Sequence, residues 1–459
     1  METSYTKSAV ARTRTRWGIL AMLFVITTIN YADRATISIA GPEIKKALGL
    51  SPVEMGYIFS AFAWSYVIAQ VPGGWLLDRF GSKITYFCSI FFWSVFTVMQ
   101  GWIGFLTGAT AVVALFALRL IVGAAESPSF PGNSRITSAW FPTSERGLAA
   151  AIFNSAQYFA TVLFAPIMGW LVHSYGWPSV FFFMGTLGIV LAFVWLKTIY
   201  APKDHPRVSH GELDYIEAGG ALVDLDQAKG ERAKARQVDT WACIKELLSN
   251  RMLLGVYLAQ YCLTTLTYFF LTWFPVYLVT ERHMTILKVG FVASLPAIAG
   301  FTGGLLGGFA SDRLVKAGYS LSLARKSVIV AGMLLSMSMI LCNYVDGDAF
   351  VVAIMSLAFF GKGVGALGWA VVSDTSPKEA GGLSGALFNT FGNTAGITTP
   401  IVIGYIVQAT GSFAGALVFV GANAAIVIVS YLFVVGEIRR VELKRSLVRA
   451  VPATGTQLA

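Results

Sequence analysis

The sequence has few charged residues, few cysteines and few histidines, and each shortage excludes a class of protein. Only 13% of the 459 residues are charged, whereas a soluble domain averages about 25%, so almost any water-soluble enzyme is excluded. The four cysteines stand singly, without a C-x-x-C pair, which indicates neither a disulfide framework nor a zinc site. The four histidines form no metal-spaced pair either. We therefore expect no metal and no resident cofactor.

Long apolar runs are abundant instead, with 56% hydrophobic residues and a mean hydropathy of +0.66. A bilayer core needs about 20 apolar residues per helix, and these runs are too long for barrel strands. The first run lacks a small-residue cleavage site and is interpreted as a retained helix. The sequence predicts an all-α membrane protein with twelve transmembrane helices at about 17–40, 55–77, 84–106, 110–132, 148–172, 177–199, 252–280, 287–311, 326–344, 349–372, 382–409 and 413–435.

Basic residues gather on one face of this topology. Of the 34 lysines and arginines, 27 fall on the face that holds both termini and the long loop, four on the other face, and three inside spans. The positive-inside rule places both termini and the long loop in the cytoplasm, in an inner membrane. The net charge of +10 is therefore a topology signal. We expect no nucleic-acid partner, and the bilayer itself as a partner.

The chain divides into two pseudo-symmetric six-helix halves. We predict a cytoplasmic N-terminus (1–16), a first bundle (17–199), a cytoplasmic linker (200–251), a second bundle (252–436) and a cytoplasmic tail (437–459). The pattern G-x-x-x-D-R begins at Gly74 at the end of the second predicted span and again at Gly308 at the end of the eighth. Such repeats are typical of transporters. We interpret the doubled motif as a charge latch that holds one facing of the pore, formed by Gly74, Asp78, Arg79, Asp312 and Arg313; ordinary interfacial charge is the alternative.

The twelve spans, the two halves and the doubled motif resemble the major facilitator superfamily. The segments NYADR (30–34), MGYIFSAF (55–62), ESPSFPGN (126–133) and FNSAQY (153–158) look like its anion:cation symporter family. The segment FFGKGVGALGW (359–369) and the following SDT (373–375) are similar to bacterial sugar-diacid transporters, those for glucarate and galactarate. The resemblance covers about residues 15–442 and implies the major facilitator fold.

Five ionisable residues lie inside predicted spans, where such groups are costly and functional by default. They are Asp33, Arg34, Arg119, Glu126 and Lys362. Three cations against two acids leave a surplus positive charge that would attract an anion. Arg119 and Glu126 are two turns apart, about 10 Å along one helix face, and we expect both to face one cavity. Asp33 is a candidate partner for Arg119, and structural ion pairs between helices are the alternative for each charge.

The chemistry of a sugar acid assigns roles to these groups. An arginine offers a bidentate fork to a carboxylate, and we choose Arg34. A buried carboxyl can load and release a proton, and Asp33 and Glu126 are the candidates. The resemblance implies the same: proton coupling at the positions of Asp33 and Glu126, and sugar-acid binding at those of Tyr31, Arg34, Tyr66, Gln157 and Asn389. We add Arg119, Gln260, Lys362 and Trp369 to the substrate-binding set, with helix–helix hydrogen bonding as the alternative for the amides.

Lys362 lies in an otherwise apolar, glycine-rich run. A dicarboxylate can use two cations, one at each end, so we hypothesise that Arg34 and Lys362 grip both ends and that Lys362 selects the diacid. A lysine that only pairs helices is the alternative.

The sequence thus predicts a monomeric, proton-coupled symporter that imports sugar-acid anions, glucarate or galactarate above all, by alternating access. The rival interpretations are a galactonate or hexuronate symporter, an organic-anion exchanger, and a transporter-like membrane sensor. No nucleophile–base set supports an enzyme.

Overall fold

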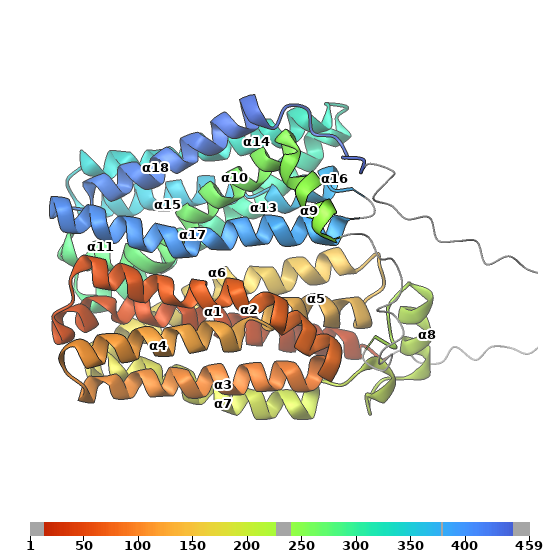
Figure 1. The fold of residues 1–459 in the computed structure, drawn as a ribbon, viewed down its shortest axis with the longest axis horizontal. Helices are drawn as coiled ribbons and strands as arrows, with labels where there is room; N and C mark the ends of the chain where they lie inside the picture. Colours follow the sequence, from red (N-terminus) through yellow and green to blue (C-terminus); the bar gives the residue numbers. More distant parts are fainter. Residues whose placement is uncertain (1–12, 226–239, 378–379, 444–459) are drawn as a thin grey trace, which may run out of the picture. The chain divides into compact units, whose positions relative to one another are not determined.

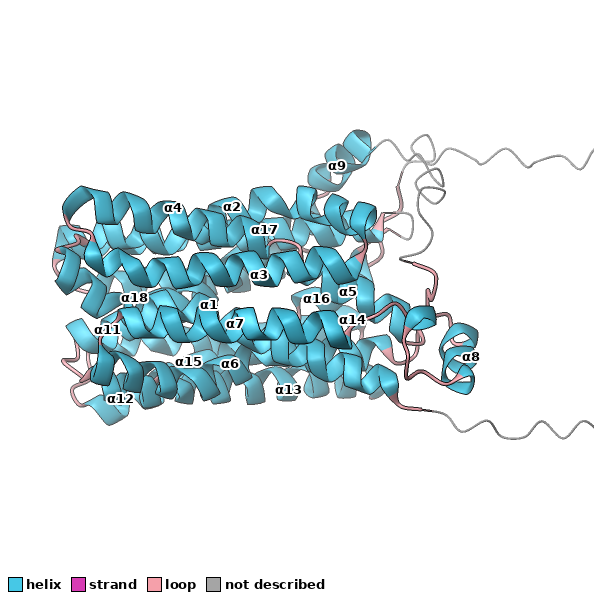
Figure 2. Ribbon diagram, turned by 90° about the horizontal axis from the view of Figure 1, so that it is seen from below, coloured by secondary structure: helices cyan, strands magenta, loops and turns pink. Residues whose placement is uncertain are grey.

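The computed structural model describes residues 13–225, 240–377 and 380–443, and every regular element in these ranges is a helix (Figures 1 and 2). Most of the predicted N-terminal segment, the middle of the predicted linker and the end of the predicted tail lie outside the described residues.

All twelve predicted spans are helical. The first six are α1 (Thr15–Leu48), α2 (Pro52–Phe80), α3 with η1 (Ser82–Gly101, Trp102–Phe105), α4 with α5 (Gly108–Glu126, Ser129–Trp140), α6 (Arg146–Tyr175) and α7 (Pro178–Thr198). The other six are α10 with η4 and α11 (Arg251–Tyr268, Phe269–Trp273, Phe274–Thr280), α12 with α13 (Ile286–Val292, Ser294–Lys316), α14 with η5 (Leu321–Ser336, Met337–Asn343), α15 with α16 (Asp348–Val364, Gly368–Thr375), α17 (Gly381–Thr410) and α18 with η6 (Ala414–Val429, Ser430–Val434).

Nine of these helical stretches within the described residues are both long and apolar enough to cross a membrane. The other three, α1, α2 and α17, are at least 29 residues long but contain more polar side chains. In α1, Asn30, Asp33 and Arg34 occupy consecutive turns. One of the three less apolar helices, α1, is thus the helix that carries the candidate residues Asp33 and Arg34.

By their internal contacts the described residues form two compact units. Unit 1 contains residues 13–225, 270–298 and 397–413. Unit 2 contains 240–269, the described residues of 299–396, and 414–443. The predicted boundaries at residues 199 and 252 are not boundaries of these units, and the division into two six-helix bundles stays a prediction.

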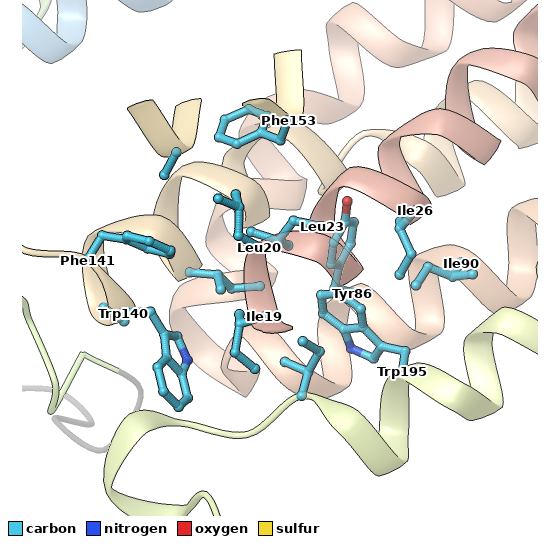
Figure 3. Close-up of a cluster of buried hydrophobic side chains, with 14 of the residues drawn as sticks. Ile19, Leu20, Leu23, Ile26, Tyr86, Ile90, Trp140, Phe141, Phe153 and Trp195 are labelled. Atoms are coloured by element: carbon cyan, nitrogen blue, oxygen red, sulfur yellow. The ribbon is translucent and has the colours of Figure 1, made fainter. Parts of the chain in front are cut away.

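A hydrophobic cluster in unit 1 joins α1, α3, α5 and α7 (Figure 3). Tyr86 and Trp195 are fully buried and meet edge to face with ring centroids 4.5 Å apart. The indole N–H of Trp195 donates to the carbonyl of Lys83 at 2.9 Å, so its polar atom is satisfied. The cluster holds Ile26 of α1 near Ile90 of α3 (Figure 3). Two turns further along each helix come Asp33 and Thr97, which the same alignment brings together.

Unit 1 also contains parts of the second half of the sequence packed on the first. A Cβ at Gly56 of α2 would lie 2.6 Å from the carbonyl oxygen of Pro400, and a Cβ at Gly169 of α6 would lie 3.0 Å from Cα of Gly290. Trp273 donates to the carbonyl of Pro400 at 3.1 Å. Only glycine permits backbones to approach so closely. The ends of α2 and α6 are therefore tightly closed against α17 and α12.

The first part of the predicted linker is folded onto unit 1. Helix α8 (His210–Ala218) lies within the predicted linker and is not a solvated surface helix, since Glu212 and Ile216 are fully buried. Glu212 accepts hydrogen bonds from Thr13 and from the backbone of Thr15, and it pairs with Arg16 at 3.1 Å. Figure 1 shows α8 beyond the ends of the long helices. The described part of the linker thus holds the start of α1 in place through Glu212. Counting charges along the sequence does not predict this contact.

Glycines bring the helices of unit 2 close together. A Cβ at Gly361 of α15 would lie 2.6 Å from Cβ of Leu335, and one at Gly368 of α16 would lie 2.6 Å from the ring of Phe388. The G-x-G-x-x-G pattern at 363–368 begins in α15 and continues into α16, so it packs membrane helices and forms no nucleotide-binding turn.

Candidate functional site

An ion pair between α1 and α4 is the centre of the candidate site in unit 1. Arg34 Nε donates to Glu126 Oε1 at 2.5 Å, and its Nη2 pairs with the same oxygen. Glu126 is fully buried and Arg34 is 8% exposed. Glu126 is the last residue of α4, because Pro128 follows and cannot continue the hydrogen-bond ladder before α5 begins. The break in the fourth span thus positions the carboxylate opposite Arg34.

Aromatic rings surround the Arg34 guanidinium. Its Cζ lies 4.9 Å from the ring centroid of Tyr31, 4.7 Å from Phe62 and 4.8 Å from Tyr66. Tyr66 is buried and stacks on Phe62. Rings stabilise a cation through their negative faces, most strongly where water is excluded. The predicted residues Tyr31, Arg34 and Tyr66 therefore form one site, to which Phe62 is an addition.

Asp33 points to a different helix, as its 100° offset from Arg34 requires. Its Oδ2 accepts a hydrogen bond from Thr97 Oγ1 of α3 at 2.9 Å, and both side chains are buried. Its Oδ1 has no hydrogen-bond partner among the described residues. Thr97 was missed at the sequence level because a threonine in an apolar span carries no distinctive signal.

Arg119 lies on α4, two turns before Glu126, and it pairs with neither Asp33 nor Glu126 within the part of the chain that the structure describes. It is 3% exposed, its Nε has no hydrogen-bond partner there, and its Cζ lies 5.4 Å from the Phe62 ring. The expected Asp33–Arg119 pair is thus not formed in this state. Phe62 lies against both Arg34 and Arg119 and separates two like charges.

A series of buried hydrogen bonds links α3, α5 and α1. Tyr86 donates to Asn133 Oδ1 at 2.9 Å, and Asn133 Nδ2 donates to Thr27 at 3.0 Å. Asn133 ends the ESPSFPGN segment, so the segment that begins with Glu126 also holds α5 to its neighbours.

Gln157 is not tied to this group by any hydrogen bond. Its amide donates to the carbonyl of Asn154 in its own helix at 3.2 Å. Its predicted role in substrate binding stays a prediction.

In unit 2, Gln260 of α10 lies close to α16 and α17, the helices that carry the predicted residues Trp369 and Asn389. A Cβ at Gly368 would lie 2.8 Å from Gln260 Oε1, and one at Gly392 would lie 3.1 Å from Gln260 Cγ. Gly368 precedes Trp369, whose exposed ring packs on Phe388 at 5.0 Å. Gly392 lies one turn from Asn389, whose carbonyl accepts from Asn393. Gln260, Trp369 and Asn389 therefore belong to one neighbourhood.

Lys362 is the buried cation of unit 2. It lies in the last turn of α15, is 4% exposed, and has its Nζ 5.0 Å from the ring centroid of Phe359. A buried ammonium group is costly unless it is compensated.

The two copies of the doubled motif form different ion pairs. In unit 1, Asp78 accepts from Arg135 of α5 at 2.5 Å. In unit 2, Arg325 of α14 donates to Asp312 and to Asp374, both at 3.1 Å. The motif arginines are not the partners: Arg79 lies over the ring of Trp75, and Arg313 is exposed. A Cβ at Gly74 would meet open space. Arg135, Arg325 and Asp374 are therefore additions to the predicted set.

The described residues hold no group of three histidine, cysteine or acidic side chains able to bind a metal ion.

Twelve membrane-spanning helices, a doubled motif at helix ends and a buried ion pair ringed by aromatics define a multi-pass membrane transporter fold. The sequence model of the Major Facilitator Superfamily matches residues 23–324. The chain belongs to this superfamily and has its fold of twelve transmembrane helices.

Three comparisons place the chain further. It is 66% identical over 434 residues to the "Probable galactarate/D-glucarate transporter GudP" of Bacillus subtilis (strain 168), with 95% of each chain covered. It is 41% identical to the "D-galactonate transporter" of Escherichia coli O6:H1, covering 93% of this chain and 97% of that one. The crystal structure of a D-xylose-proton symporter matches the fold with a TM-score of 0.70 at 14% identity, over 92% of this chain and 98% of that one.

Proposed function

We propose that this protein is a proton-coupled symporter that imports sugar-acid anions, above all the hexarates glucarate and galactarate. The observation that carries the proposal is the buried Arg34–Glu126 pair inside its ring of aromatics. The similarity in sequence to proteins named as galactarate/D-glucarate transporters supports the substrate class.

Proton and substrate transport are coupled because Glu126 and the substrate carboxylate compete for the guanidinium group of Arg34. Two donors of Arg34 are directed at Glu126 Oε1, and a substrate carboxylate would need the same donors. When Glu126 takes up a proton it loses its charge, and Arg34 becomes available to the substrate. When Glu126 loses that proton on the other side, it competes again and displaces the substrate. Proton and anion must therefore load together.

Asp33 provides a second protonatable carboxyl. It faces Thr97, with Arg34 beside it on the same helix and Arg119 and Glu126 across from it on α4. Moving one uncompensated charge against the membrane potential costs about 2.3 kcal/mol per 100 mV. A dianion needs two protons for neutrality, and two carboxyls are present. A reversal potential giving one proton per diacid would rule out this stoichiometry.

Lys362 is proposed to supply the second fixed cation that a diacid requires and a monoacid does not. The amides of Gln260 and Asn389 are proposed to bind the polyol, with Trp369 as a wall of the substrate cavity. We further propose an inner-membrane monomer with both termini in the cytoplasm, no resident cofactor and no catalytic chemistry.

Proton uptake into proteoliposomes tests the proposal. The protein is reconstituted with a trapped pH dye, and glucarate, galactarate, galactonate or glucuronate is added outside. Acidification by the two diacids alone is the expected result. A response to monoacids only would keep the symporter and move its substrate to galactonate or a hexuronate. No response, with binding intact, would replace symport by exchange or sensing.

A further inference from the structure

A cavity of about 1010 Å³ opens at one end of unit 2, where the chain leaves η6. Its walls are the start of α10 (Asn250–Met252), the end of η6 and the following segment 437–442. Figure 1 shows this segment running from α18 toward the ends of α14 and α16. Positive-inside counting assigns this end to the cytoplasm.

The walls of the cavity are held in place. Gly436 turns the chain with a φ of +61°, beyond η6. Ile438 then donates its backbone N–H to Ser322 Oγ at 2.7 Å, and Val441 donates to the carbonyl of Thr375 at 2.9 Å. Ile438 and Leu443 are buried. The described part of the predicted cytoplasmic tail is thus anchored on α14 and α16 as far as Leu443.

The lining contains three arginines and two glutamates. Arg251, Arg439 and Arg440 face Glu437 and Glu442, and all five are exposed. None of the three arginines forms an ion pair with a described residue. Arg251 donates to the carbonyl of Phe433 at 2.8 Å and Arg440 to that of Ser373 at 3.3 Å, so both guanidinium groups are positioned without being neutralised.

One side of the cavity is apolar and continues along the helices. Phe433 is 70% exposed, and Leu254 and Leu258 of α10 are exposed as well. On membrane-spanning helices such residues face acyl chains. The amphipathic helix α9 (Thr240–Ser249) precedes α10 and exposes Trp241, an aromatic typical of the membrane interface. A basic pocket with a lipid-facing apolar wall matches a molecule with an anionic head and apolar chains.

We propose that this cavity binds the headgroup of an anionic phospholipid, with its phosphate on Arg251, Arg439 and Arg440 and its acyl chains along Leu254, Leu258 and Phe433. Basic pockets on the cytoplasmic side of membrane proteins bind such headgroups, and sites of about 300–1,000 Å³ hold drug-sized ligands. Arg440 donates to the carbonyl of Ser373, next to Asp374, which accepts from Arg325. The bound lipid therefore stabilises the segment that adjoins the motif of the second half.

Thermal unfolding of the purified full-length chain tests this site independently of transport. The Tm is measured in neutral detergent with phosphatidylcholine, and again with phosphatidylglycerol in its place. Preferential binding to the folded state raises the Tm, here by about 2–3 °C. Arg439→Gln with Arg440→Gln should abolish most of the increase. The matched control, Lys197→Gln with Arg207→Gln, removes two exposed cations elsewhere and should keep it.

Two further arms keep the proposal open to refutation. The double variant Glu437→Gln with Glu442→Gln removes the acidic side chains of the cavity and should enlarge the increase in Tm caused by phosphatidylglycerol. This variant tests the lipid site if the arginine variant does not fold. Inorganic phosphate at millimolar concentration should leave the Tm unchanged. Three results would each overturn a phospholipid site. They are an equal increase in Tm with inorganic phosphate, a full increase with phosphatidylglycerol in the arginine variant, and an increase no larger than that of the unmodified protein in the glutamate variant.

Discussion

The two halves of the sequence hold their buried charges in different ways. In the first half, Arg34 and Glu126 are paired, and Asp33 is hydrogen-bonded to a neighbouring helix. In the second half, Lys362 of α15 is buried, with its Nζ 5.0 Å from the ring centroid of Phe359. A buried carboxyl group can take up and release a proton, whereas an ammonium group stays charged and attracts an anion. This difference supports the proposal that proton coupling depends on the first half and the selection of diacids on the second.

The largest effect is expected from Glu126→Gln, which breaks coupling. The amide mimics the protonated acid, so Arg34 stays available and substrate binding persists. Each proton lost from the cycle lowers the attainable accumulation by about 50-fold at 100 mV, because the charge is worth about 2.3 kcal/mol. Accumulation and counterflow are measured in the same proteoliposomes. Counterflow should survive while accumulation is lost; loss of binding would show a purely structural ion pair.

Lys362→Gln should weaken diacid binding by about 10- to 100-fold, since a hydrogen bond to a charged group contributes about 1.5–3 kcal/mol. Binding of a monoacid should change less than threefold. Calorimetric titration of glucarate and galactonate separates the two. Asn393→Ala, which removes the hydrogen bond that Tyr268 of α10 donates to α17 in the same unit, is the control for general damage. Equal losses for both ligands would contradict a selective role.

Thr97→Val removes the donor that Asp33 accepts from within α3. Ionised Asp33 loses its hydrogen bond, so the pH midpoint of transport should rise by about one unit, equivalent to about 1.4 kcal/mol. Arg34, Arg119 and Glu126 face the same carboxyl and remain in place. Thr97→Ser keeps the hydroxyl and should restore the midpoint. An unshifted midpoint in Thr97→Val, or an equal shift in Thr97→Ser, would contradict a role of this hydrogen bond in setting the midpoint.

The smallest effect concerns stability at the linker. Burial raises the pKa of Glu212, but hydrogen bonds from Thr13, Thr15 and Arg16 outweigh it, and the pKa lies below the ordinary value of 4.5. A lowered folded-state pKa contributes stability above pH 4.5 that is lost as the pH falls through the folded pKa. Glu212→Gln should therefore cost about 1–3 kcal/mol at pH 7.

That cost should diminish below pH 4.5. Thermal unfolding at several pH values measures it. The pKa of Glu145 is also lowered, because its hydrogen bonds and charge contact with Arg16 outweigh the effect of burial, so some pH dependence should remain in the variant. A cost that is constant with pH would show that Glu212 acts through packing alone.

Much of the fold and part of the site could be predicted from sequence. The twelve spans follow from apolar run length, with the largest end differences at Leu48 and Trp140, where polar residues continue the helices. Tyr31, Arg34, Tyr66 and Glu126 were each predicted as candidate site residues, and the structure brings them together. Partners that depend on which helices are neighbours were not predictable. Asp78 pairs with Arg135, fifty-seven positions away, and no spacing rule relates them.

The sequence alone determined that the chain spans a membrane twelve times, because burying backbone in lipid requires long apolar helices. It also determined which ionisable groups lie inside, since a charge within an apolar run is visible without coordinates. Only the tertiary structure decided how these groups combine. Arg34 meets Glu126 while its neighbour Asp33 meets Thr97, because adjacent residues on a helix point about 100° apart. Which helix stands in each direction is set by the packing of side chains from distant parts of the chain.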